Sequence, residues 1–289
     1  MGRRALLIVN GKSRSGKAAL PKVIEGLRKF GINPVHRDCD SREQLPALIA
    51  SEGVNADIVV VGGGDGTLNA AAAAIARLKR PLGILPLGTA NDLARTLEIP
   101  ADLDAAMRII AGGKIRSIDV GLVNDVMFFN VASVGLSTQL SQALTADIKR
   151  RFGKLGYALA ATRVLAGARP FHAEIIAGGR SIRSLSLQVA VGNGRYYGGG
   201  NVVEKNATIV DESLDLYSLE FVQAWRMVLM FRSFRCGEHG ALNEVLTLRE
   251  DQFEIRTRRP RPVNADGEIV TQTPAVFRVL PKAIDVIVP

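Results

Sequence analysis

The sequence predicts two domains: an N-terminal α/β domain with a doubly wound, Rossmann-like parallel sheet, and a C-terminal, mostly antiparallel β-sandwich domain. The chain has 289 residues, of which 47% are hydrophobic, enough for about two domains of ~150 residues. Up to about residue 115, short apolar runs alternate with amphipathic runs of helical spacing, and beyond it β-like runs predominate. We therefore expect domains at 1–118 and 119–280, with the tail 281–289 completing the first.

In the first domain, strands and helices are expected to alternate. Gly31 is expected to end the first helix, and Pro46 indicates that Ser41 caps the second, whose regular part begins near the proline. The run 56–64 is continuously β-rich, which is typical of a strand buried on both faces. The expected strands are 5–10, 32–39, 56–64 and 82–88, and the expected helices are 17–31, 41–53, 67–78 and 89–97.

In the second domain, β-like runs are interrupted by two helical segments. The run 117–135 is read as two strands about a turn at Asn124-Asp125, and 171–194 as a hairpin about Gly178-Gly179. Further strands are expected in 213–221, 252–258 and 275–281, and helices near 138–166 and 223–235.

The net charge of +9 favours a polyanionic partner: nucleic acid, an anionic membrane face or a phosphorylated substrate. The few aromatic residues are not interleaved with the basic ones, so we expect no nucleic acid. Basic residues gather at 149–151 and at Arg256, Arg258, Arg259 and Arg261, which could also be merely solvated. The sequence carries no signal of an oligomeric state.

Two cysteines, Cys39 and Cys236, form neither a disulfide framework nor a metal-binding pattern, so a cytoplasmic protein is expected. The N-terminal apolar run is too short for a signal peptide, and nowhere do ~18 apolar residues run unbroken. The segment 221–235 mixes large apolar residues with arginines. It is read either as a helix lying on a bilayer or as a helix packed over the β domain.

The stretch "VVVGGGDGTLN" at 59–69 leads from a buried strand into a helix. Gly62, Gly63 and Gly64 expose backbone amides at a helix N-terminus, which predicts an anion site to which Thr67 can add a hydroxyl donor. Asp65 would repel phosphate unless it binds a cation, a ribose hydroxyl or water, so it indicates a nucleotide with magnesium. The alternative is a tight turn that merely needs glycine. The spacing fits neither the dinucleotide fingerprint nor a P-loop.

A second polar turn, "LPLGTANDLA" at 85–94, follows the next strand. Gly88 breaks the strand, Thr89 can donate, and Asn91 and Asp92 stand where a helix begins. Adjacent strand ends of a doubly wound sheet face one crevice, so both turns are expected to serve one site. Plain helix capping by Asn91 and Asp92 is the alternative.

A third stretch, "NADGEI" at 264–269, places two carboxylates between β-like runs. Asp266-Gly267 is either a simple hairpin turn, or the segment supplies a base that accepts a hydroxyl proton, Glu268. In an extended segment Asp266 would share the face of Glu268 and could orient or replace it.

Six motifs stand in order along the chain: "VNGKSRSG" (9–16), "GGGDGTLN" (62–69), "GILPLGTANDLA" (83–94), "VGNGRYYGGG" (191–200), "NATIVDESLDL" (206–216) and "NADGEI" (264–269). In this order they resemble the diacylglycerol kinase catalytic superfamily and, within it, the bacterial YegS-like lipid kinases. The resemblance covers essentially the whole chain. It implies an ATP-dependent kinase for a lipid hydroxyl, with the nucleotide in the cleft between an α/β and a β-rich domain.

The resemblance also implies site residues. Nucleotide contacts are expected from Gly62, Gly63, Gly64, Asp65, Gly66, Thr67, Asn69, Gly88, Thr89, Asn91 and Asp92. A structural Mg²⁺ falls on the Asp211 carboxylate and the backbone carbonyls of Thr208 and Ser213, and the proton acceptor on Glu268. The sequence departs from the family in lacking a threonine near Cys39 or Asp40, in Ala70 after Asn69, and in Glu212 where glycine usually follows the metal aspartate.

The sequence thus predicts an ATP- and Mg²⁺-dependent kinase of a membrane lipid alcohol, such as diacylglycerol or phosphatidylglycerol, working peripherally at an anionic membrane. The alternatives are a NAD kinase and a catalytically weak lipid- or nucleotide-binding regulator. The motifs at 206–216 and 264–268 favour the lipid kinase over the NAD kinase. Asp65, Asp211 and Glu268 together argue against a degenerate binder.

Overall fold

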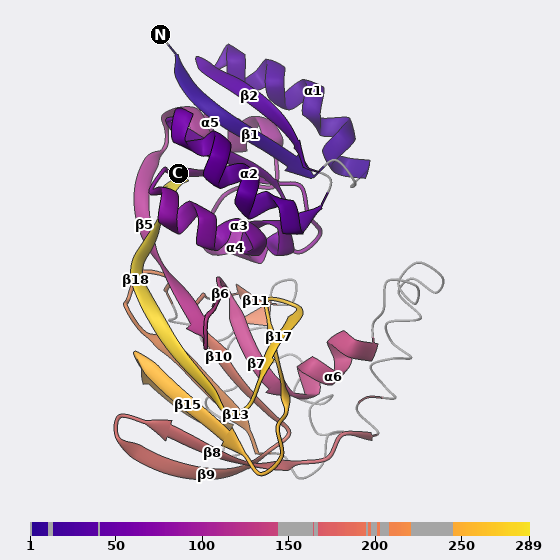
Figure 1. The fold of residues 1–289 in the computed structure, drawn as a ribbon, viewed down its shortest axis with the longest axis vertical. Coiled ribbons are helices and arrows are strands. Elements are labelled where there is room, and N and C mark those ends of the chain that lie inside the picture. Colours follow the sequence, from indigo (N-terminus) through magenta and orange to yellow (C-terminus); the bar gives the residue numbers. More distant parts are fainter. Residues whose placement is uncertain are drawn as a thin grey trace. The chain divides into compact units, whose positions relative to one another are not determined.

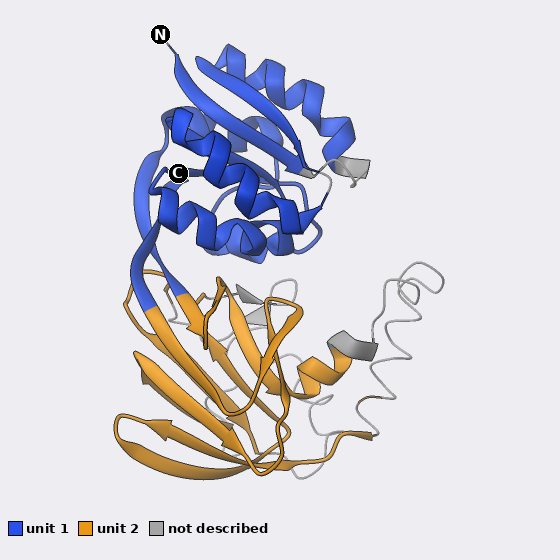
Figure 2. Cartoon of the chain, in the orientation of Figure 1, with its two compact units in different colours: residues 1–120, 198–200, 280–289 blue, residues 121–197, 201–279 orange. Residues whose placement is uncertain are grey.

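The computed structural model describes residues 2–10, 14–39, 41–143, 164, 167–194, 196–197, 201–202, 208–220 and 245–289. The chain forms two compact units (Figure 2), one from residues 1–120 and 280–289 and the other from 121–197 and 201–279. Two strands, β5 (Lys114–Val123) and β18 (Ala275–Val288), contribute residues to both units. The division predicted at residues 118 and 280 falls in these same two strands.

The first unit is an α/β domain with a parallel sheet in the order β2-β1-β3-β4-β18 (Figure 1). The chain winds outward from β1 in both directions, and α1 contacts α5 while α2 contacts α3. This is the predicted doubly wound arrangement. The strands are β1 (Arg3–Asn10), β2 (Ile32–Cys39), β3 (Ile58–Gly63) and β4 (Leu82–Pro86), and the helices are α1 (Arg14–Lys29), α2 (Leu45–Glu52), α3 (Asp65–Leu78), α4 (Asp92–Thr96) and α5 (Leu103–Gly112).

The β-rich run expected to be buried on both faces forms β3. All six residues of β3 are buried, as expected for a β-branched run covered on both faces. The alanines of α3 let that helix approach the sheet closely, since Ala71 and Ala72 are fully buried. Gly31, with φ of 79°, turns the chain after α1 as predicted.

Two local predictions for this unit differ from the structure, and one helix was not predicted. Ser41 makes no side-chain capping bond and precedes a short 3₁₀ turn (Arg42–Gln44), whereas the α-helix starts at Leu45, beside Pro46 as predicted. The helix expected over 89–97 is confined to α4. Helix α5 was not among the predicted elements, although the Asp102 side chain caps it by accepting a 2.8 Å hydrogen bond from the Ala105 amide.

The second unit is the predicted antiparallel β domain, built from two sheets. One has the order β14-β13-β10-β7-β16-β17; the other continues from β18 through β15 and β8 to β9, with β5 and β6 alongside. The strands are β6 (Val126–Phe128), β7 (Val131–Gly135), β8 (Phe171–Ala177), β9 (Arg180–Ser186), β10 (Gln188–Gly192), β13 (Leu214–Leu219), β14 (Val245–Glu250), β15 (Gln252–Thr257), β16 (Pro262–Ala265) and β17 (Glu268–Gln272), with a separate short pair, β11 (Tyr196–Tyr197) and β12 (Asn201–Val202).

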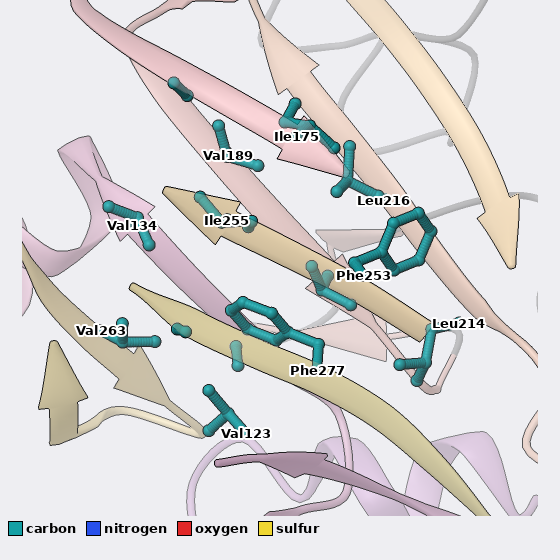
Figure 3. Close-up of a cluster of buried hydrophobic side chains, with 14 of the residues drawn as sticks. Val123, Val134, Ile175, Val189, Leu214, Leu216, Phe253, Ile255, Val263 and Phe277 are labelled. Atoms are coloured by element: carbon teal, nitrogen blue, oxygen red, sulfur yellow. The ribbon is translucent and has the colours of Figure 1, made fainter. Parts of the chain in front are cut away.

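Side chains from both sheets share one apolar core (Figure 3). Val134, Leu216 and Val263 of one sheet and Phe253 and Phe277 of the other belong to the same buried cluster, as a sandwich requires.

Both predicted hairpin turns are present in this unit. Asn124 has a left-handed backbone between β5 and β6, and Gly178 and Gly179 both have positive φ between β8 and β9. Each run nevertheless makes three strands where two were expected. In 117–135, β6 ends at Phe128 before β7 begins, and in 171–194, β9 ends at Ser186 and β10 joins the other sheet.

Helix α6 (Leu136–Ala143) covers the start of the predicted 138–166 helix. The basic run 149–151 and the segment 221–235 lie outside the described residues. Among the helices that the structure does describe, none is both long and apolar enough to cross a bilayer.

Candidate functional site

The glycine-rich stretch forms the turn between β3 and α3. Gly64 is the N-cap residue of α3, with an extended backbone and no side-chain cap, and Asp65 begins the helix. Backbone amides of the first turn of an α-helix have no intrahelical acceptor, and the helix dipole makes this end positive. The predicted anion site therefore has the local backbone that it needs.

The two polar turns meet backbone to backbone. A Cβ built on Gly88 would lie 2.4 Å from the Gly64 Cα, and one on Gly64 would lie 3.0 Å from the Gly88 Cα. The Leu87 amide also donates to the Gly63 carbonyl at 3.0 Å. The carboxyl ends of β3 and β4 thus form one surface of bare backbone, and a side chain at Gly88 would push the two turns apart.

Asn91 holds the second turn in shape instead of capping α4. Its backbone is left-handed, its Oδ1 accepts from the Gly88 amide at 3.0 Å, and its Nδ2 donates to the Gly88 carbonyl at 3.0 Å. The structure shows no side-chain capping bond from Asn91 to α4. The capping alternative is therefore wrong for this residue.

Asp65 ties the two turns together. Its Oδ1 accepts a 3.0 Å hydrogen bond from the Leu93 amide in the first turn of α4. Within the described part of the chain this is the one hydrogen bond of the Asp65 carboxylate, so Oδ2 keeps its capacity to accept from a ligand or bind a cation.

The remaining predicted nucleotide contacts differ in exposure. Gly88 and Thr89 are exposed, whereas Gly66 and Asn69 are half-buried. Thr67 is 6% exposed, and its side-chain atoms lie within 3 Å of where a Gly63 Cβ would be, so burial favours a packing role over phosphate donation. Asp92 is 4% exposed, so it too lies inside the fold and not on the open surface of the turn.

Sequence reasoning missed Arg42 at this site. The guanidinium lies 2.8 to 3.1 Å from where a Cβ on Gly66 would be, which places an exposed cation against the first turn of α3. The sequence around Arg42 shows only the apolar spacing of a helix, and that spacing does not indicate a contact between Arg42 and the first turn of α3.

The predicted metal residues form a loop folded around the Asp211 carboxylate. Oδ1 accepts from the Ser213 hydroxyl at 2.8 Å and the Ser213 amide at 3.2 Å, and Oδ2 accepts from the Thr208 amide at 3.4 Å. Glu212 has φ of 57°, a conformation that glycine adopts more easily, so the glycine that the resemblance leads us to expect here would fit the backbone with less strain.

The chemistry of this loop fits a hard cation. Oδ2 of Asp211 has only long contacts with protein donors, and carboxylate and carbonyl oxygens are the ligands that Mg²⁺ prefers. Among the described residues no group of three His, Cys, Asp or Glu gathers as a metal cluster, and the predicted site itself names one carboxylate, that of Asp211.

Asp266 has a structural role that the sequence did not suggest. Its carboxylate accepts backbone amides of three consecutive residues, Phe129 at 2.7 Å, Asn130 at 3.1 Å and Val131 at 3.0 Å. Asp266 also has φ of 46° and Gly267 of 95°, so the two residues form the turn between β16 and β17. The expectation that Asp266 shares a strand face with Glu268 is therefore wrong, because Asp266 lies in the turn and not in an extended segment.

Glu268 is the first residue of β17 and is exposed. The turn before it is anchored twice, by the Asp266 carboxylate and by the Gly267 amide, which donates to the Asn264 Oδ1 at 3.0 Å. A carboxylate on an anchored turn at a sheet edge is accessible to a substrate, which a proton acceptor requires.

Buried amides surround this turn. Asn130 Oδ1 and Asn264 Nδ2 have no hydrogen-bond partner in the structure, although both residues are at least nine-tenths buried. The Asn130 carbonyl accepts from the Asn193 amide at 2.9 Å and the Asn130 amide donates to Asp266 Oδ1, so Asn130 links the "VGNG" and "NADGE" motifs.

Known proteins match the chain along its whole length. Residues 4–123 match the family described as "Diacylglycerol kinase catalytic domain", and residues 130–288 match "YegS C-terminal NAD kinase beta sandwich-like domain". A "Probable lipid kinase YegS-like" of Pectobacterium atrosepticum is 33% identical over 288 residues, which cover 96% of this chain and 94% of the relative.

Two further matches agree. A protein of the same description from Pseudomonas aeruginosa is 30% identical and is matched over 94% of its length by 99% of this chain. A crystal structure described as a "putative diacylglycerol kinase" from Bacillus anthracis superposes with a TM-score of 0.84 at 27% identity, covering 99% of this chain and 95% of that one.

Proposed function

This chain belongs to the diacylglycerol kinase catalytic family, with a C-terminal domain of the YegS type, and on that premise we propose that it transfers the γ-phosphate of ATP to a hydroxyl of a membrane lipid. The observation that carries the proposal is the close approach of Gly64 and Gly88. It leaves bare backbone beside the N-terminus of α3 in a family of kinases.

Phosphate binding is assigned to the first unit. Amides at the start of α3 are oriented for anionic oxygens, and the absence of a Cβ at Gly64 and Gly88 lets phosphates come close to the backbone. Asp65 is then assigned two tasks: Oδ1 holds α4 through the Leu93 amide, and Oδ2 would serve as a ligand for the metal of the nucleotide or for bound water.

Metal binding is assigned to Asp211 in the second unit, with the backbone of Thr208 and Ser213. When bound there, Mg²⁺ supplies positive charge that holds the 208–213 loop in one conformation. The loop is already closed around the carboxylate by Ser213, which orients Asp211 before any ion arrives.

Proton acceptance is assigned to Glu268. A lipid alcohol is a poor nucleophile at neutral pH, and a carboxylate within hydrogen-bonding reach of its proton assists the attack. Asp266 does not compete for this task, because its carboxylate is committed to three backbone amides.

The acceptor is proposed to be a lipid of the diacylglycerol or phosphatidylglycerol class, reached by peripheral association of a cytoplasmic protein with an anionic membrane. The net charge of +9 and the names of the relatives support this choice.

A radiolabelled-ATP assay tests the function directly. The purified protein is incubated with Mg²⁺ and mixed vesicles carrying diacylglycerol, phosphatidylglycerol or sphingosine, and in parallel with NAD. Label is expected in a lipid product and not in NADP. Labelled NADP would establish the NAD kinase reading instead, and no labelled product with any acceptor, while ATP still binds, would favour a regulator.

A further inference from the structure

Three charged side chains of the second unit meet beside the proposed metal site. Asp211 lies in the 208–213 loop, Asp215 follows on β13, and Arg249 stands directly opposite Asp215 on β14. Arg249 was not part of any sequence motif. Only the pairing of the two strands brings it to the aspartates.

Arg249 is held in place by Asp215. Its Nε donates to Asp215 Oδ1 at 2.8 Å and its Nη2 to Asp215 Oδ2 at 3.1 Å. This bidentate salt bridge fixes the plane of the guanidinium. The side chain of Asp215 is 13% exposed, so this pair is sheltered from water more than an ordinary surface pair.

The fixed guanidinium also faces Asp211. Its Nη2 lies 3.5 Å from Asp211 Oδ2, the oxygen that is not committed to Ser213. A divalent ion bound to Oδ2 would therefore have a positive charge as its near neighbour. Like charges a few ångströms apart repel, and they repel more where water is partly excluded.

We propose that Arg249 is an internal counter-cation of the Asp211 site, which competes with the divalent ion for Oδ2 and raises the Mg²⁺ concentration needed to fill the site. The proposal rests on the metal site of the proposed function. It adds that Arg249 sets the affinity of this site for a divalent ion. In metal-free protein the Arg249 charge is shared between Asp211 and Asp215, and a divalent ion on Oδ2 would displace the contact with Asp211 and leave the pair with Asp215 in place.

Replacing Arg249 by glutamine should tighten the site. Removing one positive charge from the vicinity of Oδ2 is expected to lower the dissociation constant for a divalent ion about tenfold. Calorimetric titration with Mg²⁺, and with Mn²⁺ as a second probe, measures this on the protein without nucleotide or lipid. A failed kinase assay therefore leaves this test intact.

Three controls separate the charge from other effects. Arg256→Gln removes an arginine that likewise forms a bidentate salt bridge, with Glu254, and should leave the affinity for the divalent ion unchanged. Arg249→Lys keeps the charge and should stay within about threefold of the wild type. Asp211→Asn added to Arg249→Gln should abolish the tighter binding, which assigns the effect to this site.

Thermal unfolding gives a second readout. Arg249→Gln removes the guanidinium charge beside Asp215 and Asp211, so its melting temperature without metal should fall, and saturating Mg²⁺ should restore most of the loss. Mg²⁺ should shift the wild type much less.

Unchanged or weaker binding in Arg249→Gln overturns the proposal, as does equally tight binding in Arg249→Lys. A variant that stays unfolded in saturating Mg²⁺ shows that Arg249 is purely structural, and also overturns it. Binding by Arg249→Gln alone, with none by the wild type, would support it in its strongest form. If neither protein binds the ion, Asp211 is no cation site and the proposal is refuted, whatever the kinase assay shows.

Discussion

Gly64 and Gly88 are the residues on which the shape of the proposed phosphate site depends. A Cβ at Gly88 would lie 2.4 Å from backbone that cannot move aside, whereas one at Gly64 meets its nearest neighbour at 3.0 Å. Gly88→Ala should therefore cost about 1–3 kcal/mol of stability through overpacking and weaken ATP binding more than Gly64→Ala does. Calorimetry with ATP and thermal unfolding test the ranking.

Gly112→Ala is the matched control for these substitutions. Gly112 ends α5 in the same unit, and nothing lies within 4 Å of its Cβ position. It should leave ATP affinity unchanged. Equal ATP affinities in Gly88→Ala and Gly112→Ala would show that the approach of the two turns has no part in binding.

Asp266 and Glu268 differ in role, and paired substitutions should separate them. Asp266→Asn loses the charge that three amides share, and charge-assisted bonds are worth about 1.5–3 kcal/mol, so unfolding should become easier by about that amount. Glu268 lies at an exposed strand end, so Glu268→Gln should lower stability less than Asp266→Asn does while slowing turnover ~10²- to 10⁴-fold.

Urea unfolding and turnover rates measured on both variants decide the assignment. The anchoring role of Asp266 is refuted if Asp266→Asn unfolds like the wild type. The base is not Glu268 if Glu268→Gln keeps its rate within a few-fold.

At the residue scale, the sequence located the polar residues but not their partners. The partners of Asp266 are more than 130 residues away in the chain, and those of Asn91 depend on a left-handed backbone that no local pattern required. Only folding brings such groups together. A glycine turn, by contrast, depends mainly on the local backbone conformation. Gly31, Gly178 and Gly179 were therefore predicted correctly as turn residues.

Among elements, helices α3 and α4 are coupled through one carboxylate. Asp65→Ala removes the acceptor of the Leu93 amide and should lower stability by about 1 kcal/mol. Asp65→Asn keeps an acceptor oxygen, so it should fold normally, bind ATP and turn over slowly. Thermal unfolding and steady-state kinetics of both variants test this. If both variants lost the same stability, the negative charge of Asp65, and not its hydrogen bond with the Leu93 amide, would be what stabilises α4.

Element prediction succeeded where periodicity was strong. The buried run of β3 was read from its β-rich pattern, and the hairpin of β8 and β9 from β-like runs on either side of Gly178-Gly179. Helix α5 was missed although Asp102 followed by buried Ala106, Met107 and Ile110 carries the ordinary signal of a capped amphipathic helix. The helix expected over 89–97 was too long because Asn91 keeps its first part in a turn.

At the scale of the whole molecule, the net positive charge is expected to favour an anionic surface. The four arginines of the basic cluster differ in how open they are to such a surface: Arg256, Arg258, Arg259 and Arg261. Arg256 is paired with Glu254, and Arg261 packs 4.2 Å over the Phe171 ring, where burial lowers the pKa of its guanidinium. Arg258 and Arg259 are exposed in the loop between β15 and β16. These two are the arginines of the cluster best placed to reach lipid phosphates.

Binding to anionic vesicles should therefore depend on Arg258 and Arg259. Each basic residue near a membrane surface contributes about 1 kcal/mol, so Arg258→Gln with Arg259→Gln should weaken binding about 30-fold. Sedimentation with phosphatidylglycerol-containing vesicles measures it, and added salt should weaken wild-type binding by screening. Arg180→Gln with Arg183→Gln is the control, because it removes two exposed arginines of β9 and the same net charge. If both double variants lose the same affinity, net charge alone drives docking. If neither loses any, this loop does not meet the membrane.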